Sequence, residues 1–104
     1  QYVPAGTMLG AMNLHAYLSS DGAMSAVDLA GAVNCNPDQI RHWRHGYEGR
    51  RPGPEYCAAI EKATQGAVTC EALRPDLTWH RVPDKTWPGR RGRPLHDVTA
   101  QVAQ

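Results

Sequence analysis

The pattern of hydrophobic and polar positions is clearest between residues 25 and 46, where it predicts two short helices joined by a tight turn. Ser25, with Asp28 three residues on, is typical of a capping box at a helix start. Asn36 opens the second helix, with Pro37 at the first helical position and Gln39 at the third. Apolar residues at helical spacing form one stripe across the pair: Leu29, Val33, Ile40 and Trp43. This arrangement predicts a helix-turn-helix.

The predicted turn, at residues 33–35, contains Asn34. A tight turn between helices usually needs one residue with positive φ, and asparagine tolerates that region better than most residues other than glycine. Ala30 is small at the point where the second helix would cross the first. An αα-hairpin within a small helical bundle would show the same pattern and is the alternative to a DNA-binding motif.

Three further helices are predicted around this pair. Asn13 caps a helix that runs to about residue 20, Pro54 begins one over residues 54–64, and Thr69 caps a short one that ends at Arg74. Together the helices predict an all-α fold of five short helices, with residues 12–74 as one domain. Residues 1–11 show no periodicity, and we expect an irregular N-terminal extension there.

From Pro75 onward the composition changes to a Pro/Gly/Arg-rich tail, residues 75–104, in which frequent prolines leave no room for a helix of normal length. Alternation of apolar and polar residues predicts two short strands, at residues 78–82 and 95–99. Trp79 and Trp87 are costly to leave exposed, so we expect part of the tail to pack on the helices or on a partner subunit. A wholly disordered tail is the alternative.

The charge of the chain is unevenly distributed. The formal net charge is only +1, but residues 1–36 contain two Asp and neither Lys nor Arg, whereas residues 37–104 hold all eleven basic residues. A basic bias that begins at the second helix of the pair favours a face that meets phosphate.

Several classes of protein are disfavoured by what the sequence does not contain. Three cysteines without a CxxC pair, namely Cys35, Cys57 and Cys70, indicate reduced thiols rather than disulfides or a zinc site. The five histidines lack metal-ligand spacing, no cofactor motif is present, and no enzyme signature occurs. Because no apolar run approaches the ~20 residues of a membrane span, we expect a cytoplasmic protein that is not an enzyme and binds no metal or cofactor.

The second helix of the pair carries the candidate recognition chemistry. If Ile40 and Trp43 point inward, the opposite face presents four polar side chains: Asp38, Arg41, His42 and His45. Arginine is the usual bidentate partner of guanine O6 and N7, aspartate can orient it or accept from cytosine N4, and histidine can donate to a base or phosphate. The alternative is an ordinary solvated helix face with a weak surface ion pair.

Contacts with the phosphate backbone are expected beside this face. The helix N-termini at Ser25 and Asn36 would offer free N–H groups and the positive end of the helix dipole. Side chains at the flanks and just after the helix complete the set of candidate backbone contacts: Gln39, Arg44, Arg50 and Arg51.

The tail contains a second basic motif, PGRRGRP at residues 88–94. Its Arg-Gly-Arg-Pro segment matches the core of an AT-hook, which lays arginines into a narrow minor groove. Minor-groove insertion, non-specific phosphate contact and a plain Gly-Pro loop are all open for these arginines: Arg90, Arg91 and Arg93.

Residues 13–76 resemble the Cro-like helix-turn-helix regulators of bacteria and phage, in particular the YdaS-type branch. The resemblance lies in MSAVDLA at 24–30, NPDQIRHWRHG at 36–46, Pro54 followed by IEKATQGAV at 60–68, and TCEALRPD at 69–76. It implies a lambda-repressor/Cro-like fold of about five helices that binds double-stranded operator DNA as a dimer or higher oligomer and represses transcription. Asn34 stands where the commonest pattern has Gly, and the tail after Asp76 lies outside the common core.

The sequence therefore predicts a DNA-binding repressor that docks residues 37–45 in the major groove of a palindromic operator. The alternative is an antitoxin or protein-interaction module whose C-terminal tail binds a toxin or another protein.

Overall fold

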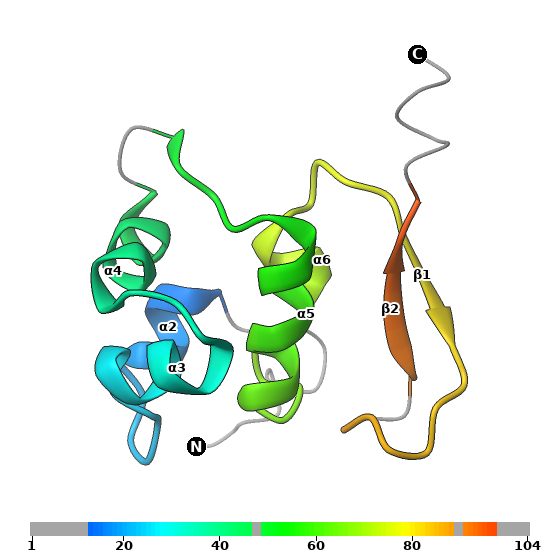
Figure 1. Ribbon diagram of the computed structural model, residues 1–104, viewed down its shortest axis with the longest axis horizontal. Helices are drawn as coiled ribbons and strands as arrows, with labels where there is room; N and C mark the ends of the chain where they lie inside the picture. The colour runs from blue at the N-terminus through cyan, green and yellow to red at the C-terminus, as the bar shows by residue number, and fades with distance from the viewer. Residues whose placement is uncertain (1–12, 47–48, 89–90, 98–104) are drawn as a thin grey trace.

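The computed structural model describes residues 13–46, 49–88 and 91–97, and the predicted extension at residues 1–11 lies outside these ranges. The described chain contains five helices followed by a two-stranded antiparallel sheet (Figure 1). The helices are α2 (Leu14–Leu18), α3 (Ala26–Val33), α4 (Pro37–His45), α5 (Pro54–Ala63) and α6 (Cys70–Leu73), and the strands are β1 (Trp79–Val82) and β2 (Arg93–His96). The prediction of five short helices is confirmed. The all-α description is corrected to a mostly helical fold with a small sheet.

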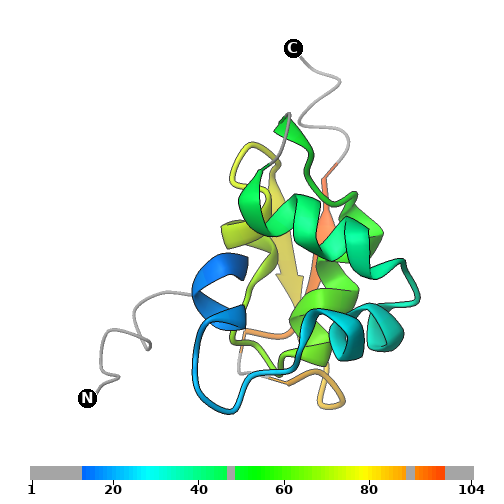
Figure 2. The same ribbon diagram turned by 90° about the vertical axis from the view of Figure 1, so that its left-hand side faces the viewer.

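The elements are arranged from one end of the molecule to the other. Helices α2, α3 and α4 form one end in Figure 1, α5 and α6 lie in the middle, and the sheet forms the opposite end. In the turned view of Figure 2, α4 lies across the near side with the strands behind it. The sheet therefore leaves the outer side of α4 uncovered.

Side-chain caps explain where α3 and α4 begin. Ser25 Oγ accepts a hydrogen bond from the Asp28 N–H at 3.1 Å, as expected for an N-cap serine. At α4 the capping box is complete, because Asn36 Oδ1 accepts from the Asp38 N–H and Gln39 Oε1 accepts from the Asn36 N–H. These local signals are the ones that made both helices predictable.

The turn between α3 and α4 has the geometry expected from its asparagine. Asn34 ends α3 in the left-handed region, with φ 62° and ψ 53°. The N–H of Cys35 then bonds back to the carbonyl of Ala30 at 2.9 Å. The chain reverses within a few residues, and α4 packs against α3.

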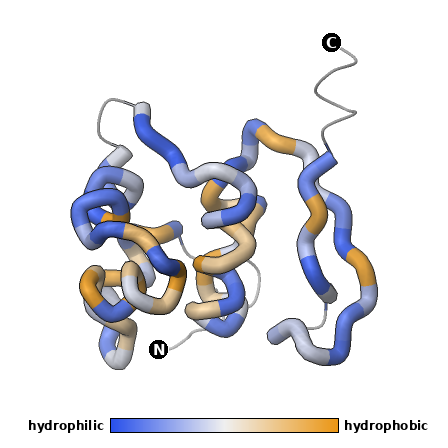
Figure 3. The backbone as a smooth tube through the Cα atoms, in the orientation of Figure 1, coloured by the Kyte–Doolittle hydropathy of each residue, from blue (hydrophilic) through white to orange (hydrophobic). Residues whose placement is uncertain are grey.

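The core lies between α3, α4 and α5. The largest fully buried side chains come from all three helices, from the loop after α5 and from the start of α6: Leu29, Ile40, Cys57, Ile60, Val68 and Cys70. Burial raises the pKa of the Cys57 thiol to about 12, so this sulfur stays protonated at neutral pH. Figure 3 shows the contrast in hydropathy along the two helices, since α4 is coloured mostly hydrophilic while α5 carries more apolar positions.

The two strands are paired in a defined register. Trp79 lies opposite His96 and Arg81 opposite Pro94, which places β1 within the predicted range. The second strand begins two residues earlier than the predicted 95–99, and residues 98 and 99 lie outside the described chain. Pro94 is accommodated because each strand of a two-stranded sheet is an edge strand.

A buried carboxylate attaches the sheet to the helices. Glu61 on α5, with a side chain 3 % exposed, accepts from Arg81 Nη2 at 2.8 Å and from Trp87 Nε1 at 2.8 Å. Arg81 also bonds to Glu71 on α6, and Gly92 O accepts from it at 2.9 Å. The expected packing of Trp87 on the helices is thus observed, and full disorder of the tail is excluded for its described part.

Candidate nucleic-acid interface

The outer face of α4 has the orientation that its sequence predicts. Ile40 is fully buried, and Trp43 is half-buried with its ring centroid 5.3 Å from that of Tyr56 on α5. The four predicted base-contacting residues therefore share the opposite face, where His42 is partly covered and the other three are exposed: Asp38, Arg41 and His45.

Asp38 and Arg41 form an ion pair on this face. Arg41 Nη1 lies 2.9 Å from Asp38 Oδ1, and the two side chains are 52 % and 72 % exposed, respectively. A pair this exposed contributes about 0–1 kcal/mol. Arg41 can therefore leave Asp38 for another acceptor at little energetic cost.

The predicted phosphate contacts at the start of α4 need a correction. We expected free N–H groups at Asn36, but its own N–H bonds to Gln39, and the N–H of Asp38 bonds to the Asn36 side chain. Pro37 has no N–H, and the N–H groups of Gln39 and Ile40 bond to the Asn36 carbonyl. The positive end of the helix dipole remains there, together with the amide NH2 of Gln39 as a side-chain donor.

Arg44 points to the other flank of α4. Its Nε donates to His15 Nδ1 at 3.0 Å and its Nη2 donates to Ser19 Oγ at 2.9 Å. His15 lies on α2, and Ser19 is the residue that ends this helix. Sequence reasoning placed Arg44 beside the phosphate backbone and missed His15 and Ser19. Their i, i+4 spacing places both on one side of the first helix, but no local pattern relates that side to Arg44.

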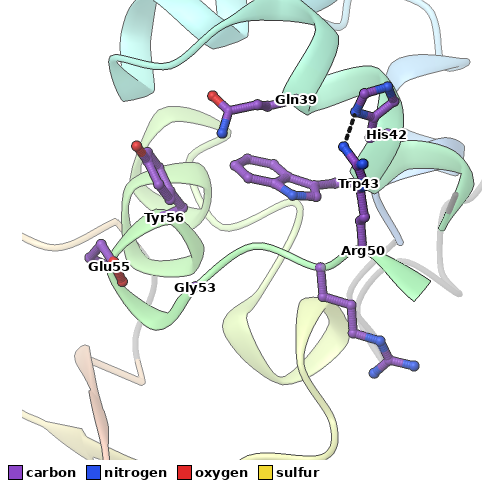
Figure 4. Close-up of a pocket in the computed structure, with 8 residues that line it drawn as sticks. Gln39, His42, Trp43, Arg50, Gly53, Glu55 and Tyr56 are labelled. Carbon is purple, nitrogen blue, oxygen red and sulfur yellow. Dashed lines mark hydrogen bonds between the residues drawn. The ribbon is translucent and has the colours of Figure 1, made fainter. Parts of the chain in front are cut away.

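Arg50 and Arg51 follow α4 and border a hollow between α4 and α5 (Figure 4). Arg50 Nη1 lies 3.3 Å from His42 Nδ1, so the loop contacts the outer face of the helix. Arg51 lies 3.3 Å from Asp76, whose pKa is lowered to about 2 mainly by its hydrogen bonds from Arg74.

The hollow has a volume of about 370 Å³ and an aromatic wall. In Figure 4 the Trp43 ring lies between Gln39 and the side chain of Arg50, with Tyr56 across the hollow. Tyr56 is half-buried and forms part of this wall, a position that the sequence analysis did not predict.

Strand β2, which begins at Arg93 of the PGRRGRP motif, lies at the opposite end of the molecule from α4 (Figure 1). Arg91 pairs with Glu71 at 2.9 Å and Arg93 Nε lies 3.2 Å from Asp84, whereas Arg90 lies outside the described residues. An AT-hook needs an extended, detached backbone. Here β2 pairs Arg93 and Pro94 with β1, so the backbone of these two residues is part of the sheet.

The described residues contain no group of three or more His, Cys, Asp or Glu side chains placed to hold a metal ion. Within the same ranges, every helix is too short or too polar to cross a membrane.

Comparison with known proteins connects this geometry to a family. Residues 21–82 match the family model described as "Bacterial toxin YdaS". The chain is also 41 % identical over 58 residues to "Putative transcriptional regulator YdaS" of Escherichia coli (strain K12), a match that covers 56 % of this chain and 55 % of that protein. The chain thus spans about half the length of this curated relative, and no solved structure gives a significant match. Because the family model covers more than half of the 104 residues, the chain belongs to the YdaS family.

Proposed function

We propose that this protein is a sequence-specific DNA-binding regulator of transcription, in which α3 and α4 form a helix-turn-helix and α4 enters the major groove. The observation that carries the proposal is the outer face of α4, where Asp38, Arg41 and His45 are exposed together while Ile40 is buried against α3. The name of the Escherichia coli relative, which describes a regulator, supports the same class of function.

Base recognition is assigned to Arg41 first. A guanidinium on an exposed helix face can donate two parallel hydrogen bonds to guanine O6 and N7, worth about 1–3 kcal/mol of discrimination. Asp38 pairs with the guanidinium in the free protein and can accept from a neighbouring cytosine N4 once Arg41 has moved to a guanine. His42 and His45 lie on the same face and supply donors to a base or phosphate.

Phosphate contacts are assigned to the groups that border this face. Arg50 and Arg51 lie in the loop after α4, and the positive ends of the α3 and α4 dipoles begin at Ser25 and Asn36. These contacts fix the position of the helix and carry no sequence information themselves. We further propose that two copies bind a palindromic operator and repress the adjacent gene.

A gel-shift series tests these assignments. The operator variants to compare differ at one base pair in each half-site. Arg41→Ala should reduce the ratio of affinities between them by about tenfold. Arg50→Ala should weaken binding to all sequences alike and lower the slope of log affinity against log salt by about one. Lys85→Ala, which removes one positive charge from the exposed connection between β1 and β2, is the matched control and should change neither quantity.

If neither arginine variant alters DNA affinity at low salt, the proposed interface is wrong. A change of equal size in Lys85→Ala would show that net charge, rather than the outer face of α4, governs binding.

A second candidate function is a protein-interaction module, and the outward face of the sheet favours it. Leu95 is 42 % exposed there and lies opposite the exposed His80. Deleting residues 75–104 would not test this function, because it would leave Glu61 buried without Arg81. Leu95→Asn is the sharper variant, and loss of a co-purifying protein with DNA binding intact would favour the interaction module.

A further inference from the structure

A second hollow lies at the junction of α2 and α4, and it shares Trp43, Arg50 and Arg51 with the hollow between α4 and α5. Its volume is about 260 Å³. None of its described lining residues is Asp or Glu. Five of the side chains that line it are arginines or histidines: His15, Arg44, His45, Arg50 and Arg51. Its floor is apolar and includes Leu14, Pro52 and Leu73.

Arg44 is the central cation of this hollow. The acceptors of its hydrogen bonds are an imidazole nitrogen of His15 and a hydroxyl of Ser19, and neither group carries a negative charge. Guanidinium groups held in a fixed position form their strongest hydrogen bonds with carboxylates and phosphates. Arg44 is therefore fixed in orientation by α2 while its charge is not neutralised by these partners.

Two histidines extend the set of donors. Because His15 accepts from Arg44 through Nδ1, the neutral ring carries its proton on Nε2, which can donate to a further group. The ring of His45 on α4 lies 5.7 Å from that of His15, centroid to centroid. Donors from two helices thus converge on one concave surface.

We propose that this hollow binds a phosphate group, with Arg44, His15 and His45 as its donors. The volume is just below the range of about 300–1,000 Å³ typical of small-molecule sites, which suits a phosphate group with little attached. The negative end of the α4 dipole, roughly half a charge, opposes an anion here, but it is smaller than the full positive charge of Arg44, whose hydrogen bonds to His15 and Ser19 go to uncharged groups.

The phosphate can come from the DNA backbone or from a small phosphorylated compound. In both cases the bound group would bridge α2 and α4 and stiffen the support of the recognition helix. Binding of the anion itself does not depend on the proposed function, whereas its effect on DNA affinity rests on it.

Titration of the 15N-labelled full chain with inorganic phosphate, at constant ionic strength against sodium chloride, tests the site directly. We expect saturable NMR shifts at His15, Ser19 and His45. Arg44→Gln should weaken phosphate binding by about tenfold, since a charge-assisted hydrogen bond is lost, while the charge-matched control Lys85→Gln should leave it unchanged. His45→Gln, at an exposed position where folding is not at risk, should weaken it by about threefold.

Shifts that rise linearly without saturation overturn the proposal. Equal phosphate affinity in Arg44→Gln and Lys85→Gln also overturns it. If Arg44→Gln does not fold, equal phosphate affinity in His45→Gln and Lys85→Gln overturns it instead.

DNA titrations with and without saturating inorganic phosphate identify the source. If phosphate weakens DNA binding by the wild type but not by Arg44→Gln, the site takes a backbone phosphate. If DNA affinity is unchanged or raised, the site takes a separate phosphorylated ligand. A chain that binds phosphate saturably but no DNA would retain this site and refute the proposed function alone.

Discussion

Glu61 connects three parts of the described chain that are distant from it in sequence. Its carboxylate accepts hydrogen bonds from Arg81, from the indole of Trp87 and from the N–H of Cys70. Burial acts to raise the pKa of Glu61, but these hydrogen bonds outweigh it and hold the pKa below its ordinary value. The residue is therefore charged at neutral pH and fixes the sheet to α5.

Replacing Glu61 by glutamine should reduce the free energy of unfolding by about 3 kcal/mol or more, because Arg81 would remain largely buried with half of its compensation removed. Urea denaturation followed by circular dichroism measures the loss. Glu71→Gln provides the matched comparison, since Glu71 pairs with the same arginine but is 33 % exposed, and about 1 kcal/mol is expected there. A Glu61→Gln loss no larger than that of Glu71→Gln would contradict the assigned role.

The lowered pKa of Glu61 also predicts an acid dependence of stability. A carboxyl whose pKa is lower in the folded state stabilises the fold above its unfolded pKa, about 4.3 for glutamate, and the stabilisation disappears as pH falls through the folded value. Asp76, with a pKa of about 2, acts in the same direction. The urea midpoint should therefore fall between pH 5 and pH 3, less steeply in Glu61→Gln, and equal slopes in the two proteins would exclude Glu61 as a source.

At the scale of elements, the α3–α4 pair depends on one left-handed residue in its turn. Asn34→Gly should leave stability unchanged or slightly raised, because glycine adopts positive φ without steric cost. Asn34→Val should lower the free energy of unfolding by about 1–2 kcal/mol or more, since a β-branched side chain is disfavoured there. Thermal unfolding of both variants measures this, and a valine variant as stable as the glycine variant would show that the turn can relax.

The elements that the sequence predicted well are those with local signals. Both helix starts of the α3–α4 pair were readable because their caps lie within three residues, and Asn34 identified the turn. The position of β2 was less readable, because its strand is fixed by pairing with β1 and by the contacts of Arg81 with Glu61, twenty residues away.

For the candidate site too, the sequence predicted the arrangement within one helix but not the contacts between helices. Helical periodicity predicts one face of α4 for Asp38, Arg41, His42 and His45, and in the structure His42 is partly covered while the other three are exposed. The partner of Arg44 could not be found in this way, because His15 lies 29 residues away and no local pattern relates them. Periodicity shows which side chains share a face, whereas tertiary packing decides which of them are already bonded to another helix.

At the scale of the whole molecule, α5 supports both ends. Tyr56 near its start packs against Trp43 of α4, and Glu61 in its last turns holds the sheet. No described helix or strand covers the outer face of α4, which lies at the end opposite the sheet (Figures 1 and 2). The fold thus presents one helix while the rest of the described chain holds it in place.

Selection of bound sequences from a random pool of double-stranded DNA, by wild type and by Arg41→Ala in parallel, tests the central claim most directly. We predict that wild type enriches a two-fold motif whose half-sites lie one helical turn apart, about 34–36 Å. The variant should enrich a motif that loses its preference at one base pair per half-site. A wild-type pool without any enriched motif, or identical motifs from both proteins, would contradict the assignment of α4 as the helix that reads DNA.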